Sequence, residues 1–392
     1  MKTNIGVFFG GRSVEHEISV ISALQAIAAL DAQRYNAVPV YITKQGRWLT
    51  GPALLDTANY RGDLAALEKI TTRVYMKPEF GNHTLYAPRT MADPIWRNEK
   101  KIATLDVALP VLHGTNGEDG TFQGFLELIG IPYVGCGVLS SAVGMDKITA
   151  KMTLRESGLP VIDYVWFTDR QWSTDRNTLI ARIENELAYP VIVKPANLGS
   201  SVGISRARNR EELVDAVGEA STYSSRLLVE RMVSPLREIN CSVLGSPDNH
   251  RTSVCEEPIH SDEILSYADK YMNGSRDTGG GFKNAPKTDG GGGGNAHDGG
   301  GNAHGGGNAH SSKFLDPRGG NVGSKAGGTK AFSAGKAGSK TVSGGMSSTK
   351  RRIPADLTDE LSARIRQLAS ETFRVLGCDG VARVDFILDG GS

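Results

Sequence analysis

The sequence has few features of a secreted, membrane or nucleic-acid-binding protein. It has 392 residues and only four cysteines, none in a C-x-x-C pair: Cys136, Cys241, Cys255 and Cys378. A chain of this length can bury its cores without covalent links, so we expect reduced thiols and a cytoplasmic protein. There are 44 basic and 43 acidic side chains, a net charge of +1, so we expect no nucleic-acid or membrane partner.

Long apolar runs and nucleotide-binding fingerprints are also lacking. The N-terminal stretch MKTNIGVFFGGRS has only a five-residue apolar run before Gly10, which is too short for a signal-peptide core or a membrane span and suits a buried strand. The loop FGGRS is not G-x-G-x-x-G, which disfavours a nicotinamide dehydrogenase. The Gly-Ser loop NLGSSVGIS is not a Walker A motif either, since no Gly-Lys-Ser/Thr follows it.

The first third of the chain alternates strand and helix patterns. IGVFF predicts a strand buried on both faces, residues 15–30 a helix with Ile18, Ile21, Leu24 and Ala28 in one stripe, and AVPVYIT a second strand. LDVALPVLHG, TFQGFLELIG and IPYVG then predict strand, helix and short strand. This order indicates an α/β fold with a doubly wound, Rossmann-like sheet.

The later segments predict a different arrangement. Residues 140–156 read as one helix, ended by Gly158, and YPVIVKPANLGSSVGISRAR as two strands joined by a loop. A helix is expected after Asn209, which has Glu212 three residues on, as in a capping box. LLVERMV predicts a strand, residues 358–376 a helix with Gly377 as its cap, and VARVDFIL a final strand.

Residues 277–345 stand apart in composition. They are rich in Gly, Ser, Lys, Asn and Ala, contain almost no large apolar residue, and repeat GNAH three times, ending at His297, His304 and His310. Such a segment cannot bury enough surface to offset its ordering entropy, so we expect a disordered insertion that is dispensable for folding. We attribute the three histidines to chance rather than to a metal site.

Several positions could carry chemistry, each with a simpler alternative. The loop NLGSSVGIS, with Lys194 on the strand before it, could bind an anion through backbone N–H groups, or could be a plain hairpin loop. Glu15 could hold a substrate ammonium, or could be a first-turn acid favoured by the helix dipole. His113 follows a strand end, where α/β sheets bind ligands, and could move a proton, or could lie in a glycine-rich turn.

Arg383 and Asp385 alternate with apolar residues in VARVDF. The period of two places both on one face of the strand. They could form a simple ion pair, or they could be a transition-state clamp and a metal ligand.

The order of eight short blocks is more informative than any one of them. FGGRSVEHEIS, LHGTNGEDGTFQG, GMDKITAK, VIVKPANLGSSVGIS, REIN, ILSYADKY, RRIPADL and GVARVDF together resemble the D-alanine–D-alanine ligases of the ATP-grasp superfamily. The similarity covers most of residues 4–276 and 346–390. It implies a doubly wound (pre-ATP-grasp) N-terminal domain over residues 1–138, followed by a two-domain α+β ATP-grasp fold. Its central domain would span residues 139–228 and its C-terminal domain residues 229–392, with the insertion inside the latter.

The resemblance implies that ATP phosphorylates the carboxylate of one D-alanine and that the amine of a second attacks the acyl phosphate, giving a dipeptide for peptidoglycan synthesis. The expected cofactors are ATP and Mg²⁺ or Mn²⁺, and the expected assembly is a homodimer. Two lysines would contact phosphate, a Gly-Ser loop would cover it, and two glutamates would bind adenine and ribose. These ATP-binding residues are Lys147, Lys194, Gly199, Ser201, Glu230 and Glu238.

The remaining assignments concern the substrates and the metal. His113 and Lys270 would contact substrate, Lys270 by reaching the transferred phosphoryl group. Glu15 would lie near the first ammonium and would be linked by hydrogen bonds to Ser200 and Tyr271. Two residues of the last strand would complete the site: Arg383 at the oxyanion of the tetrahedral intermediate and Asp385 on the metal.

The sequence departs from the family pattern in two places. The lid after ADKY is interrupted by the insertion, and no Glu-x-Asn metal motif or Pro-Gly loop follows VARVDF, so we expect the end at Ser392 to be premature. Two other readings therefore stay open. One is a ligase that takes D-lactate as second substrate, although ADKY is typical of the dipeptide-forming type. The other is a chain that binds nucleotide without turnover, because its metal ligands are incomplete.

Overall fold

The computed structural model describes residues 2–60, 64–91, 93, 96, 98–199, 202–259 and 351–390. They belong to one unit, made of Met1–Gly281 and Gly345–Ser392. Predictions for residues 277–345, for the three histidines there and for Ser392 fall outside the described residues. The same holds for four predicted site residues: Ser200, Ser201, Lys270 and Tyr271.

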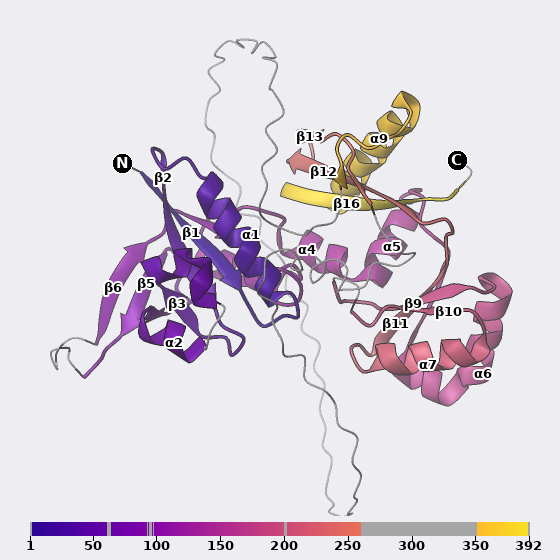
Figure 1. The fold of residues 1–392 in the computed structure, drawn as a ribbon, viewed down its shortest axis with the longest axis horizontal. Helices are drawn as coiled ribbons and strands as arrows, with labels where there is room; N and C mark the ends of the chain where they lie inside the picture. The colour runs from indigo at the N-terminus through magenta and orange to yellow at the C-terminus, as the bar shows by residue number, and fades with distance from the viewer. Residues whose placement is uncertain are drawn as a thin grey trace, which may run out of the picture. The chain divides into compact units, whose positions relative to one another are not determined.

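The N-terminal sheet has the strand order β4-β3-β2-β1-β7. Its parallel part is β1 (Thr3–Gly10) between β2 (Tyr35–Ile42) and β7 (Val107–Pro110). Two short antiparallel strands, β3 (Trp48–Thr50) and β4 (Thr72–Val74), extend it beyond β2. Figure 1 draws this sheet in indigo and purple.

Helices cover both faces of this sheet, which confirms the doubly wound prediction. Val7 and Phe9 of β1 pack in one cluster with Val20 of α1 (His16–Ala29), whereas Phe8 packs in another with Phe122 of α3 (Thr121–Ile129). The alternation of side chains along a strand therefore serves two cores. Smaller elements complete this region: η1 (Pro52–Leu55), η2 (Thr57–Tyr60), α2 (Leu64–Lys69), and the antiparallel pair β5 (Thr84–Pro88) and β6 (Glu99–Thr104).

Two details of this region differ from the sequence prediction. The stripe predicted for α1 is half right: Ile18 is buried and Leu24 packs on the core, but Ile21 is 40% exposed and Ala28 is exposed, while Val20 and Ala23 are buried instead. The helix is apolar on more than one side, so the pattern offered two possible faces. IPYVG forms no strand, only a single parallel bridge between Tyr133 and Ala108 of β7.

The helix predicted over residues 140–156 is two helices, α4 (Val138–Met145) and α5 (Lys147–Glu156). Asp146 between them is extended (φ −85°, ψ 103°), and its side chain accepts a hydrogen bond from the Thr149 N–H. An aspartate in this role satisfies a free donor of the new helix, so the chain can bend here at little cost. The break places Lys147 at the first position of α5.

The next sheet is antiparallel, with order β10-β9-β11-β8. Its strands are β8 (Tyr164–Thr168), β9 (Val191–Pro195), β10 (Ser205–Ala207) and β11 (Arg226–Arg231), and it packs on α6 (Asp169–Glu186) and α7 (Arg210–Ser221). The side chain of Asn209 accepts from the Glu212 N–H at 2.9 Å, as predicted, but the Glu212 carboxylate accepts from the Arg208 N–H instead of closing a capping box with Asn209. The predicted apolar face of α7 is buried in full: Leu213, Ala216, Val217 and Ala220.

A third sheet has the order β13-β12-β16. It comprises β12 (Arg237–Gly245), β13 (His250–Thr252) and β16 (Gly380–Leu388), and α9 (Asp359–Val375) packs on it through Ile365, Ala369 and Phe373. The last helix and strand are confirmed, with Thr358 and Gly377 (φ +62°) at the ends of α9. β14 (Glu257–Pro258), which follows β13 in the chain, and β15 (Arg351–Arg352), which precedes α9, pair as a separate two-stranded sheet.

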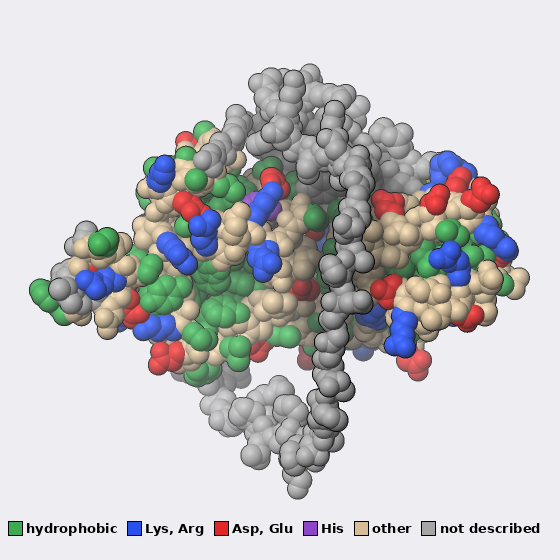
Figure 2. Space-filling model, turned by 90° about the horizontal axis from the view of Figure 1, so that it is seen from below, with side chains coloured by type: hydrophobic (Ala, Val, Ile, Leu, Met, Phe, Trp, Pro, Cys, Tyr) green, Lys and Arg blue, Asp and Glu red, His purple; other side chains and the backbone are tan. Residues whose placement is uncertain are grey.

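The surface carries charges of both signs. Figure 2 shows basic and acidic side chains interspersed on the face that it presents, in keeping with the net charge of +1. Of the helices in the described ranges, none combines the length and hydropathy that crossing a bilayer requires.

Candidate active site

The antiparallel sheet carries a buried carboxylate that two lysines contact, one from the sheet and one from α5. Glu230 on β11 is 3% exposed, and its Oε2 and Oε1 atoms lie 2.5 Å from Lys194 Nζ on β9 and 3.0 Å from Lys151 Nζ on α5. β9 and β11 are antiparallel neighbours, with Lys194 opposite Leu228 and Glu230 opposite Ile192. The pairing of two adjacent strands therefore sets the distance between the predicted phosphate lysine and the predicted adenine acid.

The two lysines determine the charge of Glu230. Burial alone would raise the pKa of its carboxyl, but Lys194 and Lys151 outweigh that effect and lower the pKa to about 2. Burial also lowers the pKa of Lys151, against the attraction of Glu230. The group is thus an anion held by two cations in a poorly solvated place, where such contacts are strong.

Lys147 adds a third cation beside this cluster. Its backbone N–H donates to the Ala196 carbonyl at 2.8 Å, which ties the start of α5 to the end of β9, and its ammonium donates to the Leu198 carbonyl. Burial and the nearby charge of Lys194 lower its pKa to about 8. The side chain therefore reaches the start of the Gly-Ser loop, the segment predicted to cover phosphate.

Glu15 lies where this loop meets the N-terminal sheet. Glu15 is 5% exposed. It is the N-cap of α1, whereas the sequence predicted that it lies one position later, in the first turn of the helix. A Cβ atom added to Gly199 would lie 2.8 Å from Glu15 Oε2, and one added to Gly114 (φ +72°) would lie 2.4 Å from the same oxygen. Two glycines from distant parts of the chain thus let their backbones approach one carboxylate.

His113 and Glu118 lie in the loop of Gly114, which approaches Glu15. His113 Nε2 lies 3.0 Å from Ser22 Oγ, and the Gly114 N–H donates to Glu118 Oε2 at 2.7 Å. Desolvation raises the pKa of Glu118, and the charge of Glu15 adds to the rise, against the opposing effects of the Gly114 N–H, His113 and Arg383. The pKa of Glu118 therefore depends both on Glu15, beside the N-terminal sheet, and on Arg383 of the third sheet.

Arg383 and Asp385 form the ion pair that the sequence allowed as the simpler reading. Arg383 Nε and Nη2 lie 2.7 Å and 3.0 Å from the two Asp385 oxygens, and both side chains point from the exposed face of β16. Asp385 is opposite Asn240 of β12. Among the described residues, no group of three Cys, His, Asp or Glu side chains could hold a metal ion. One carboxylate still fits Mg²⁺ that is otherwise held by phosphate and water.

The predicted residues are only partly brought together. Lys147, Lys194, Glu230, Glu15 and Gly199 form a connected set through the contacts above. Glu238 lies on β12, in a different sheet from Glu230, opposite Ile387. Sequence reasoning missed two residues: Lys151 and Glu118. Lys151 stands in the quoted GMDKITAK block one helical turn after Lys147, and that i, i+4 spacing was a signal that could have found it.

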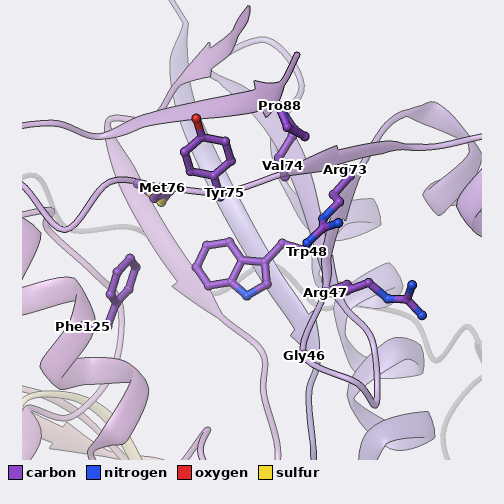
Figure 3. Close-up of a pocket in the computed structure, with 9 residues that line it drawn as sticks. All are labelled: Gly46, Arg47, Trp48, Arg73, Val74, Tyr75, Met76, Pro88 and Phe125. Atoms are coloured by element: carbon purple, nitrogen blue, oxygen red, sulfur yellow. The ribbon is translucent and has the colours of Figure 1, made fainter. Parts of the chain in front are cut away.

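Two surface pockets lie away from these residues. One, of about 450 Å³, is lined mainly by the N-terminal sheet and α3. Figure 3 shows the Trp48 indole at its centre, with Phe125 on one side and Arg47 and Arg73 on the other. The second, of about 520 Å³, lies around the Arg237–Glu257 ion pair. Neither pocket is lined by a predicted site residue.

Two family models match the chain. The first, described as D-ala D-ala ligase N-terminus, matches residues 4–136. The second, described as D-ala D-ala ligase C-terminus, matches residues 153–281 and 340–391. The gap between these last two ranges falls within the segment that the sequence marks as an insertion.

Curated relatives extend the match over nearly the whole chain. A D-alanine–D-alanine ligase of Caldicellulosiruptor bescii is 42% identical over 99% of this chain and 83% of its own length. One from Natranaerobius thermophilus is 36% identical over 99% of this chain and 82% of its own length.

Solved structures give the same result. The VanG D-Ala:D-Ser ligase of Enterococcus faecalis is similar, with a TM-score of 0.67 and 25% identity over 98% of this chain and 86% of that one. The D-alanine–D-alanine ligase of Coxiella burnetii is similar with a TM-score of 0.64 and 26% identity over 98% of this chain and 80% of that one.

Proposed function

The chain belongs to the D-alanine–D-alanine ligase family, and we propose that it joins two D-alanine molecules into D-alanyl-D-alanine for peptidoglycan synthesis. Enzymes of this family depend on ATP and need Mg²⁺. ATP transfers its γ-phosphoryl group to the carboxylate of the first D-alanine. The amine of the second D-alanine then attacks the acyl carbon, and phosphate leaves as the C–N bond forms.

The proposal assigns phosphate binding to the lysines around the Gly-Ser loop. Phosphoryl transfer needs positioning and charge neutralisation more than covalent help from the protein. Lys147 and Lys194 supply two partly buried cations at the loop that begins near Leu198. Glu230, fixed by Lys194 and Lys151, offers acceptor oxygens to the amino group of adenine, and Glu238 is assigned to the ribose. Gly199 and Ser201 cover the phosphates.

The amino acid side is assigned to the groups around Glu15. A buried carboxylate attracts an ammonium group, and Glu15 is buried between the loops of Gly114 and Gly199. His113 contacts the same substrate, and Ser200, Tyr271 and Lys270 are assigned to the lid on the sequence resemblance alone.

The exposed face of β16 is assigned to the developing charges. Arg383 stabilises the oxyanion of the tetrahedral intermediate, because its guanidinium is a fixed multiple donor. Asp385 is the carboxylate that would hold Mg²⁺, and the ion would neutralise the phosphate oxygens. Each oxygen of Asp385 accepts one hydrogen bond from Arg383, so a metal would share the carboxylate with this guanidinium or displace it.

One observation in the structure supports the proposal in addition to the family membership. The loop that follows Lys194 touches Glu15 through Gly199, so the predicted phosphate cations and the predicted ammonium acid share one small region. A ligase needs this juxtaposition because the phosphoryl group must reach the carboxylate of the amino acid whose ammonium Glu15 holds.

The direct test is to follow ADP release with ATP, Mg²⁺ and D-alanine, and to identify the product by mass spectrometry. We expect one ADP for each dipeptide formed. Parallel reactions that add D-serine or D-lactate beside D-alanine determine the second substrate. ATP binding without ADP release that depends on D-alanine would refute the ligase assignment and leave a nucleotide-binding protein.

A matched pair of variants tests the ATP site. Lys194→Ala and Lys151→Ala each remove one cation from the same carboxylate, so they share the effect on Glu230. Only Lys194 is assigned to phosphate. Truncating one partner of a desolvated charge pair costs about 2 to 5 kcal/mol, so we expect ATP affinity to fall roughly 30- to 5,000-fold in Lys194→Ala. The loss in Lys151→Ala should be clearly smaller. Equal losses would remove the phosphate role from Lys194.

Assembly, location and domain division follow as further parts of the proposal. We infer a homodimer, which size-exclusion chromatography with light scattering tests, and a cytoplasmic location, where ATP is available. The proposed domains are residues 1–138, 139–228 and 229–392. Limited proteolysis should cut near these boundaries if they separate independent folding units.

A further inference from the structure

Two pairs of cysteines lie in contact, and their surroundings differ. Cys241 of β12 and Cys255 are both no more than 2% exposed, inside the core below the third sheet. Cys136 is only half-buried, and it packs against the same core at Cys378, which is 6% exposed. One residue of this pair is therefore partly exposed, whereas both residues of the other pair are buried.

The backbone holds Cys136 and Cys378 close together. Cys378 lies three residues after the end of α9, and its N–H donates to the Phe373 carbonyl at 2.9 Å. A Cβ atom added to Gly380 would meet the N, Cα and O atoms of Gly135 at 2.8 to 3.0 Å, so the two segments touch through glycine backbones. Cys136 Sγ lies 3.7 Å from the Val381 carbonyl oxygen.

Polar groups lie around the sulfur of Cys136. Cys378, the Asp379 N–H and Ser140 lower the pKa of Cys136 to about 7, against burial and the Asp379 carboxylate. The Cys136 thiol itself donates to the Val381 carbonyl. The hydrogen bond to Cys136 and burial raise the pKa of Cys378. Burial likewise raises the pKa of Cys241. Within the described ranges no third ligand completes a metal site with either pair.

We propose that Cys136 and Cys378 are a site of reversible oxidation, at which hydrogen peroxide converts the two thiols into a disulfide. The Cys136 thiolate attacks one peroxide oxygen, the O–O bond breaks, and the hydroxide that leaves is protonated to water, leaving a sulfenic acid. Cys378 sulfur then attacks Cys136 sulfur, the S–OH bond breaks, and the Cys378 proton goes with the hydroxide as a second water. Two thiols and one peroxide give one disulfide and two waters.

The contrast between the pairs sets the expected selectivity. At pH 7 a thiol with a pKa of about 7 is half ionised, against about 1% for a thiol at the ordinary value of 9.0. The lower intrinsic nucleophilicity of the less basic thiolate offsets much of this roughly 50-fold gain, so the chemical advantage is roughly sixfold. Burial of Cys241 and Cys255 restricts access and widens the difference.

The experiment treats the reduced full-length chain with a small excess of hydrogen peroxide at neutral pH, alkylates free thiols after denaturation, and maps peptides without reduction. We expect a Cys136–Cys378 cross-linked peptide that dithiothreitol reverses, while Cys241 and Cys255 in the same sample remain alkylated. This internal comparison requires no variant. Cys136→Ser should leave Cys378 reduced, and Cys378→Ser should leave a sulfenic acid at Cys136 that dimedone traps.

Two outcomes would overturn the proposal. One is cross-linking of Cys241 to Cys255 at a rate equal to or above that of the first pair. The other is conversion of Cys136 to sulfinic acid in the unmodified chain with no intramolecular disulfide. Cys241→Ala serves as the matched control, and its peptide map should repeat the Cys136–Cys378 link.

Discussion

Replacing Glu230 by glutamine should remove a pH-dependent part of the stability of the antiparallel sheet. The substitution keeps the shape of the side chain and removes its charge. Glu230 is buried, with Lys194 Nζ at 2.5 Å and Lys151 Nζ at 3.0 Å. In the variant both ammonium groups face a neutral amide, and breaking a buried pair of this kind typically costs about 3 to 5 kcal/mol. The free energy of unfolding at pH 7 should fall by an amount of this order.

The pH dependence follows from the pKa of the carboxyl. Burial raises it, but the two lysines lower it further, to about 2 in the folded chain from an ordinary value of 4.5. A carboxyl with a depressed pKa stabilises the fold above its unfolded pKa and loses that contribution as the pH falls towards the folded pKa. A shift of this size corresponds to about 3 kcal/mol, of which about 2 kcal/mol is lost by pH 3. Glu230→Gln lacks this titration.

The assay is urea unfolding of both proteins at pH 7 and pH 3, followed by tryptophan fluorescence. Trp166 on β8 of this sheet and Trp172 on α6, which packs against it, contribute to the signal. The difference in unfolding free energy between the unmodified protein and Glu230→Gln should be about 2 kcal/mol smaller at pH 3 than at pH 7. Glu184→Gln is the control: Glu184 lies 2.6 Å from Arg210, which also lowers its pKa, but Arg210 is exposed and solvent screens the pair, so this difference should change less with pH. If this difference for Glu230→Gln does not change with pH, Glu230 is not a buried anion with a lowered pKa.

The elements with one clear apolar face were predictable from sequence. In α7 and α9 the spacing of Leu213, Ala216, Val217 and Phe373 allows only one buried side, and caps at both helices define their starts. The period of two in VARVDF also fixed which residues of β16 share a face. Local physics suffices where a pattern has one solution.

Elements with two solutions were not predictable. In α1, apolar residues lie on more than one side, and the packing on Val7 and Phe9 of β1 selects the face with Val20. The break at Asp146 is hidden because the apolar pattern continues through it, and only its cap and its ion pair with Arg226 explain the bend. These choices depend on partners far away in the sequence.

The candidate site shows the same division. The sequence placed Lys194 and the Gly-Ser loop together, because they are neighbours in the chain. It did not reveal that Lys151 shares Glu230, since that contact depends on how α5 meets the second sheet. Only the resemblance, through Ser200, brought the loop of Gly199 near Glu15. Residue types identify possible roles, whereas tertiary contacts determine which groups share a charge.

Three further predictions test how the loop and the start of α5 position the site. Lys147 has its pKa lowered to about 8, chiefly by burial, so its charge is lost as the pH rises past that value. If the ammonium binds phosphate, ATP affinity should fall about tenfold between pH 7 and pH 9 in isothermal titration, and Lys147→Arg, which stays charged, should be nearly flat. Asp146→Ala removes the cap of α5 and should lower the free energy of unfolding by about 0.5 to 2 kcal/mol in urea titrations. It should also weaken ATP binding, and unchanged affinity would show that the cap does not position Lys147. Gly199→Ala places a methyl group 2.8 Å from Glu15 Oε2, closer than real contacts allow, and the buried carboxylate has little room to move. Overpacking of this kind costs about 1 to 3 kcal/mol, so kcat/KM for D-alanine should fall roughly fivefold to 150-fold, with ATP affinity less affected. Gly124→Ala, at a helical position with open space around it, is the control and should retain full activity. Normal turnover in Gly199→Ala would show that the loop does not hold Glu15 in its working position, because the carboxylate would then have moved without consequence.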